Sequence, residues 1–174
     1  MNTKNLICPT PSPTPVRVLG IDPGLGGGMV ILNGRKEILS KLPFKKNKNG
    51  NLDCIEVHEF LQNKTVDYVY LEKVHALPNV GAGSSFTFGL AFGQIQAVLD
   101  LNLLAYKLVS PKRWQSTLTE KRRDLSPKKR ALLNALKEFP ECDLRKSSRA
   151  RVWHDGLVDA ALIALHGLKD VGVL

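Results

Sequence analysis

Cysteine is scarce in this sequence, and long apolar runs are absent. The three cysteines, Cys8, Cys54 and Cys142, form no CxxC pair, so they predict free thiols in a reducing compartment rather than a disulfide framework or a zinc site. No stretch of about 18 apolar residues is present, so neither a transmembrane helix nor a membrane partner is expected. No basic segment followed by an apolar one opens the chain, so we expect a protein that is not secreted and that acts in the cytoplasm, a nucleoid or an organelle interior.

Aromatic residues are also few, but hydrophobic residues make up 43% of the 174 residues, which suits one globular domain. Proline is placed unevenly and alternates with other residues from Pro9 to Pro15. Alternating proline supports neither a helix nor an internal strand. We therefore expect residues 1–15 to be a flexible leader and residues 16–174 to form the folded domain.

Acidic residues are fewer than basic ones, and the imbalance is local. The chain holds 25 Lys and Arg against 16 Asp and Glu, a net charge of +9. Residues 111–151 alone contain thirteen basic and five acidic residues, an excess of eight. A local basic surface predicts a nucleic-acid partner, although a solvated, solubilising surface has the same composition. Residues 45–51 form a second, smaller basic segment that we expect to be a polar loop.

The order of apolar segments predicts an α/β fold. Short apolar runs bounded by turn residues predict five strands, at residues 16–22, 29–32, 37–42, 67–72 and 103–109. Helical spacing and capping residues predict helices across residues 54–62, 88–99, 111–118, 127–138 and 153–168, with loops at 78–85 and 142–151. Three strands joined by tight turns, followed by strand–helix alternation, predict a mixed sheet flanked by helices.

Four carboxylates fall at positions that suit metal-dependent chemistry. Asp22 and Glu72 each end an apolar strand, and adjacent parallel strands end at one edge of a sheet. Asp155 and Asp159 are four residues apart, so they share one face of a helix that is apolar nearly all round and is expected to pack on both sides. Like charges on such a helix are costly unless a cation pairs with them, and two magnesium ions among carboxylates promote phosphoryl displacement.

Each acid also has a purely structural interpretation. Asp22 precedes Pro-Gly and suits a turn, and Glu72 could pair with Lys73. Asp155 suits a helix N-cap. Asp159 lies mid-helix among alanines and leucines and fits a structural role least well. The four acids are more informative together, in this order of elements, than singly.

Four segments resemble the RuvC-like Holliday junction resolvases, in particular the phage and organellar type within the RNase H-like superfamily. They are the first-strand motif Gly20–Gly24, the acidic motif Leu71–Pro78 with the following Ser84–Gly89, the Pro-x-x-Trp segment Ser110–Trp114 and the closing helix motif His154–Ala160. The segments follow the family's order between residues 18 and 167, so they cover nearly the whole folded part.

The resemblance implies an RNase H-like fold with a mixed five-stranded sheet, and a crossover junction endodeoxyribonuclease of DNA recombination and repair. Acting on branched DNA such as four-way junctions, a homodimer would hydrolyse phosphodiester bonds in pairs, leaving 5′-phosphate and 3′-hydroxyl ends. The implied cofactor is Mg²⁺, two ions per active site, with Mn²⁺ as a substitute and no small-molecule cofactor. The residues implied for both metal binding and catalysis are Asp22, Glu72, Asp155 and Asp159. The family's basic residue after Trp114 is replaced here by Gln115.

Several side chains are candidates for contacts with DNA. Lys73 follows the second acid, and Phe86 could wedge against unstacked bases, with a core or dimer-interface role as the alternative. Phe88 continues a buried helix face and suits the core better. The candidates for phosphate contacts are Lys112, Arg113, Lys128, Lys129 and Arg130, followed by Arg145, Lys146, Arg149 and Arg151. His154 either orients groups or donates a proton in catalysis, or is a surface histidine at a helix start.

The expected two-fold interface is the helix after Gly89, in which Gly93 allows close approach. Three alternatives to a resolvase stay open. One is another RNase H-fold nuclease, either an RNA–DNA hybrid cutter or a transposase-like domain. The second is a non-catalytic junction-binding protein, which the presence of all four acids disfavours. The third is an actin-like kinase or ATPase, which needs two copies of the fold, and no Walker-type phosphate loop is present.

Overall fold

The structure is a computed structural model, and it describes residues 15–74, 81–122 and 124–174. The expected flexible leader, residues 1–15, therefore lies outside the described residues except for Pro15. Residues 78–80 of the expected glycine-rich loop also lie outside them. Within the described part of the chain, no helix is long and apolar enough to cross a membrane.

A mixed five-stranded sheet forms the centre of the fold, as predicted. Its strands are β1 (Arg17–Asp22), β2 (Gly28–Asn33), β3 (Ile38–Pro43), β4 (Tyr68–Glu72) and β5 (Lys107–Val109). They lie in the order β3-β2-β1-β4-β5. β2 pairs antiparallel with both β1 and β3, whereas β4 pairs parallel with both β1 and β5. The carboxyl ends of β1 and β4 therefore lie side by side.

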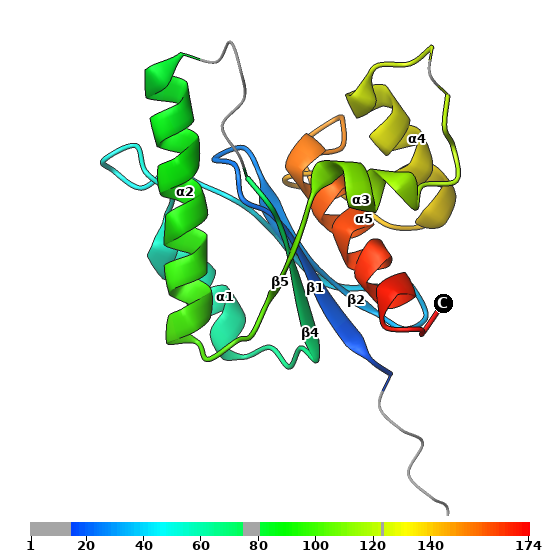
Figure 1. Ribbon diagram of the computed structural model, residues 1–174, viewed down its shortest axis with the longest axis horizontal. Coiled ribbons are helices and arrows are strands. Elements are labelled where there is room, and N and C mark those ends of the chain that lie inside the picture. The colour runs from blue at the N-terminus through cyan, green and yellow to red at the C-terminus, as the bar shows by residue number, and fades with distance from the viewer. Residues whose placement is uncertain (1–14, 75–80, 123) are drawn as a thin grey trace, which may run out of the picture.

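Helices cover both faces of the sheet (Figure 1). One face carries α1 (Cys54–Gln62) and α2 (Ala82–Leu101), and the other carries α3 (Pro111–Ser116), α4 (Pro127–Glu138) and α5 (Asp155–Asp170). Successive residues of β1 divide between two cores, since Val18 packs in the cluster of α4 and α5 and Leu19 in the cluster of α1 and α2. The central strands are thus buried on both faces, which explains their continuous apolar runs.

Two boundaries differ from the sequence-based expectation. α2 begins at Ala82, so residues 82–85 of the expected loop are helical, and Ser85 N donates to Gly81 O at 3.0 Å. The low helix propensity of Gly and Ser is overridden because these residues extend a long helix. The strand predicted at 103–109 is confined to β5, because Leu103 is 93% exposed and lies in a left-handed turn with φ of 55°.

α5 is buried along nearly its whole length, which confirms the expected packing on both sides. It lies close to β1 because Gly20 has no side chain: a Cβ there would come within 2.2 Å of the Ala160 carbonyl oxygen. A Cβ on Gly156 would lie 2.4 Å from the Gly26 carbonyl oxygen, so the first turn of α5 rests against the β1–β2 turn. These two glycines bring the start of α5 over the end of β1.

Candidate active site

The four predicted acids come from three elements that meet at one edge of the sheet. Asp22 ends β1 and Glu72 ends β4, and the parallel register pairs the residues that precede them. Asp155 and Asp159 lie in the first two turns of α5, whose start rests on the β1–β2 turn. The two acidic strands are adjacent and parallel, which was the condition for their acids to meet at one edge of the sheet.

Burial makes the ionisation of three of these acids unfavourable. It raises the pKa of Asp22 to about 6, the pKa of Glu72 to about 7 and the pKa of Asp159 to about 8. The acids also act on one another: the charge of Asp22 raises the pKa of Glu72, and the other three acids raise the pKa of Asp159 further. A site that gathers carboxylates away from water in this way favours the binding of a cation.

Glu72 is held by a residue that the sequence did not assign to the site. The buried indole of Trp114 donates from Nε1 to Glu72 Oε1 at 2.8 Å, and this hydrogen bond lowers the pKa of Glu72 against the larger effect of burial. Trp114 lies on α3, which Ser110 caps by accepting from Arg113 N, with Pro111 in the first turn. The sequence marked Trp114 only as part of the Pro-x-x-Trp segment of the family resemblance, without a contact to Glu72.

Asp155 is exposed and is paired with Lys128. Lys128 Nζ donates to Asp155 Oδ2 at 2.7 Å, and this bond raises the pKa of the lysine. The interpretation of Asp155 as the helix N-cap is wrong, because His154 takes that position and its Nδ1 accepts from Leu157 N at 3.3 Å. Burial, and then the charge of Lys146, lower the pKa of His154, so the ring is neutral at pH 7 and keeps the acceptor that the cap needs.

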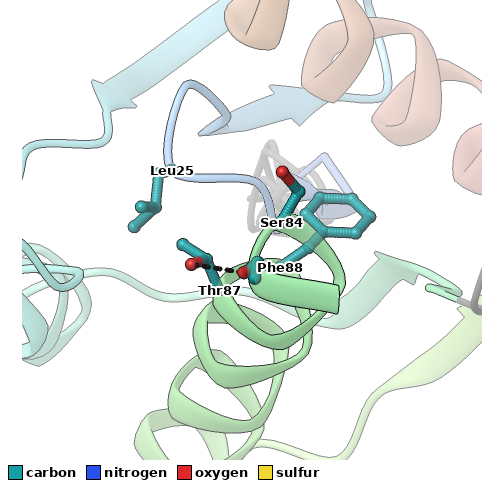
Figure 2. Close-up of a pocket in the computed structure, with 5 residues that line it drawn as sticks. Leu25, Ser84, Thr87 and Phe88 are labelled. Atoms are coloured by element: carbon teal, nitrogen blue, oxygen red, sulfur yellow. Dashed lines mark hydrogen bonds between the residues drawn. The ribbon is translucent and has the colours of Figure 1, made fainter. Parts of the chain in front are cut away.

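Most of these groups line one hollow. Its lining comes from the β1–β2 turn, α2, α4 and the start of α5, and includes Asp22, Phe88, Lys128, His154, Asp155 and Asp159. Phe88 was expected in the core and is half-buried, with its ring 3.2 Å from where a Cβ on Gly24 would lie. It also lines a neighbouring hollow together with Ser84 and Thr87 of α2 and Leu25 of the β1–β2 turn (Figure 2).

The acids are gathered but do not form a finished metal site. Across residues 15–74, 81–122 and 124–174, no three acidic, histidine or cysteine side chains stand together so that they could hold a metal ion. Glu72 accepts a hydrogen bond from Trp114, and Asp155 accepts one from Lys128. The chemistry of the donor set still suits a hard cation, because Mg²⁺ prefers carboxylate oxygens and buried like charges gain from neutralisation.

Only some of the predicted DNA contacts lie near the acids. Lys128 and Arg130 line a smaller hollow together with Gln115, the position at which the family has a basic residue. The same hollow reaches Asp159. Arg113 is instead turned toward Asp170, at the opposite end of α5, where the two side chains form an ion pair at 3.2 Å. Arg145 is paired with Asp143. The remaining candidates are exposed on the surface: Lys73, Phe86, Lys112, Lys129, Lys146, Arg149 and Arg151.

Solved structures match this fold, although no protein-family model and no curated protein matches the sequence. The structure of Thermus thermophilus RuvC in complex with a Holliday junction substrate matches with a TM-score of 0.64 and 17% sequence identity, over 91% of this chain and 97% of that chain. A second T. thermophilus RuvC structure matches with a TM-score of 0.59 and 19% identity, over 90% of this chain and 96% of that chain.

The strand order, the helices on both faces and these similarities define an RNase H-like fold. Within that class, the chain has the architecture of RuvC over about 90% of its length. The resemblance carried by the four sequence segments is therefore confirmed at the level of the fold.

Proposed function

We propose that this protein is a crossover junction endodeoxyribonuclease that resolves Holliday junctions by paired, metal-dependent phosphodiester hydrolysis. The observation that carries the proposal is the meeting of Asp22, Glu72 and Asp159 at one sheet edge, where burial raises the pKa of all three and repulsion raises those of Glu72 and Asp159 further. Perturbed carboxylates beside a hollow are typical of a functional site. That a RuvC of similar fold was solved with a Holliday junction substrate supports branched DNA as the substrate.

The residues proposed to hold the metal are Asp22, Glu72, Asp155 and Asp159. Bound Mg²⁺, or Mn²⁺ in its place, would supply positive charge against the phosphate and an activated water, giving 5′-phosphate and 3′-hydroxyl ends. Trp114 fixes one carboxylate oxygen of Glu72 and leaves the other available. Lys128 neutralises Asp155 before a cation binds, and it is free to turn to a DNA phosphate afterwards.

His154 suits an orienting role better than that of a general acid. Its lowered pKa leaves the ring uncharged at pH 7, so it holds no extra proton to give. Because Nδ1 accepts the capping hydrogen bond, the ring proton is on Nε2. We propose that this N–H donates to a phosphate oxygen in the hollow that His154 lines.

Basic side chains are proposed to hold the DNA backbone. Contacts of this kind are to phosphates, so they give an affinity that depends on salt and little on sequence. The residues are Lys73, Lys112, Arg113, Lys128, Lys129 and Arg130. Arg130 lines the same hollow as Gln115, which makes it the candidate to replace the family's basic residue there. Phe86 is 73% exposed on α2 and is the candidate wedge at the branch point.

Paired incision requires two active sites, so we propose a homodimer. The N-terminal half of α2 exposes Leu90, and Cβ atoms placed on Gly89 and Gly93 would meet nothing within 4 Å. An exposed apolar side chain beside such open positions allows a second helix to approach closely across a two-fold axis.

The test is nicking of a labelled four-way junction beside a matched linear duplex, with Mg²⁺ and then with EDTA. Asp22→Asn removes the charge but keeps the size of the side chain, and Asp100→Asn on the exposed surface of α2 is the matched control. We expect symmetric, metal-dependent incision of the junction by the wild type and the control, and none by Asp22→Asn. Binding without incision would identify a non-catalytic junction-binding protein, and preference for a linear RNA–DNA hybrid would identify another RNase H-fold nuclease.

A further inference from the structure

We propose that the loop between β3 and α1, residues 44–53, is a second DNA-binding element that contacts the phosphate backbone of an arm beside the cut site. The inference rests on the proposed nuclease function, because it assumes DNA at the acids. The loop lies outside the segment 111–151 that holds most of the excess positive charge. In Figure 1 it projects outward from the sheet (cyan).

The loop has a fixed shape despite its polar sequence. Asn47 Oδ1 accepts from Asn49 N at 2.9 Å and from Asn51 N at 3.2 Å. Asn47 Nδ2 donates to the Leu52 carbonyl oxygen at 3.3 Å, and Asn47 N donates to Asn51 O at 2.8 Å. Phe44 and Leu52 are buried at its two ends. A loop that is already ordered loses little conformational entropy when it binds a partner, because its backbone already has the shape it needs.

The loop leaves the sheet at the same edge as the acids. Pro43, the last residue of β3, pairs with Gly28, and Gly28 pairs with Asp22. Neighbouring strands are about 4.8 Å apart, so the loop begins roughly 10 Å from Asp22. That distance corresponds to about three nucleotides of a B-form arm at about 3.4 Å each. Phe44 N also donates to Gly27 O at 3.0 Å, which ties the loop to the turn that lines the active-site hollow.

The charge of the loop fits a phosphate backbone. Lys46 and Lys48 are exposed, and neither forms an ion pair within the described part of the chain. Lys45, by contrast, is paired with Glu56 of α1. The exposed residues at 45–50 are lysines, an asparagine and a glycine, so the loop offers no apolar anchor for a membrane or a protein partner. Positive charges among neutral amides suit sequence-independent contact with phosphates.

The test compares two double variants that each remove two exposed positive charges. Lys46→Gln with Lys48→Gln alters the loop, and Arg35→Gln with Lys64→Gln alters exposed positions at the opposite edge of the sheet. Affinity for a four-way junction and for a matched duplex is measured over a salt series in EDTA, so that no strand is cut. Each phosphate contact adds about 0.9 to the slope of log affinity against log salt. We expect the loop variant to flatten that slope by about 1 to 2, and the control to keep the wild-type slope.

Three results would overturn the inference. The loop variant could keep the wild-type salt slope, or the control variant could flatten the slope by the same amount. The third is a flatter slope that sedimentation velocity explains by weaker self-association of the loop variant. Far-UV circular dichroism of both variants checks that the fold is kept. The proposed nuclease function is tested separately, by the preference for junctions and by nicking. If the wild type neither prefers nor nicks junctions but the loop variant still flattens the slope on duplex DNA, the nuclease proposal fails and the loop contact stands.

Discussion

Asp159 should destabilise the metal-free protein, so Asp159→Asn should make the fold more stable. Burial raises the pKa of Asp159 from 3.8 to about 8, and the neighbouring acids add to the effect. At pH 7 the folded state therefore holds a proton that the unfolded state has released. Because the folded pKa is the higher one, the free energy of unfolding must rise as the pH falls from about 8 to about 4.

The size of the effect follows from the two pKa values. One pKa unit corresponds to about 1.4 kcal/mol, so a carboxyl that shifts this far lowers the free energy of unfolding by about 4 kcal/mol at pH 7. The neighbouring acids share protons with Asp159, so part of this effect remains when Asp159 alone is replaced. We expect Asp159→Asn to gain about 2–4 kcal/mol at pH 7 and about 1–2 kcal/mol at pH 5.

Urea unfolding in EDTA, followed by circular dichroism at both pH values, measures this gain. The control Asp100→Asn removes an exposed charge and should change stability by less than about 0.5 kcal/mol. Added Mg²⁺ should stabilise the wild type more than Asp159→Asn, because binding to the folded state raises stability by mass action. The reasoning is refuted if Asp159→Asn is no more stable than the wild type at pH 7, or if its gain is as large at pH 5.

Three further substitutions separate positioning, packing and DNA contact. Trp114→Phe keeps most of the buried ring but removes the donor to Glu72. Nicking should therefore slow about 10-fold or more, while the free energy of unfolding in urea changes by only about 1–2 kcal/mol. An unchanged nicking rate would exclude a positioning role for Trp114. Gly20→Ala should lower the free energy of unfolding in urea by about 3 kcal/mol, because the new Cβ meets backbone atoms of α5. The Cβ of Gly26→Ala meets nothing within 4 Å, so this control should be tolerated. Equal losses of stability in the two variants would contradict the close approach of α5. Lys128→Gln should weaken junction binding and flatten its salt slope by about 1, and an unchanged slope would remove this residue from the DNA contacts.

The sheet and the meeting of the acids could be predicted because both follow from local patterns. Strands buried on both faces give continuous apolar runs, and the acids that end them come together once β1 and β4 are adjacent. Asp155 and Asp159 share a helix face by spacing alone. The boundaries of the elements were less predictable. The strand predicted at 103–109 is too long, because Leu103 adopts a left-handed conformation that an apolar side chain gives no reason to expect.

The contacts that hold the acids could not be predicted in the same way. The bond from Trp114 to Glu72 joins residues 42 apart in sequence, and the pairing of Lys128 with Asp155 joins residues 27 apart. Both depend on how α3 and α4 dock, and no periodicity in the sequence encodes that. Two adjacent residues, His154 and Asp155, could each have been the N-cap of α5. The structure has His154 at that position, although aspartate is favoured there.

The place of α5 in the chain has a consequence for biosynthesis. Two of the four acids belong to α5, the last of the described elements, and the other two lie on strands made much earlier. A chain emerges from the ribosome N-terminus first, so a half-made protein displays its basic loop and Asp22 without the partners needed for cleavage. Under the proposed function, the protein can cut DNA only after α5 has packed against Gly20 and completed the core. Under that function, the enzyme would stay inactive until its folding is complete.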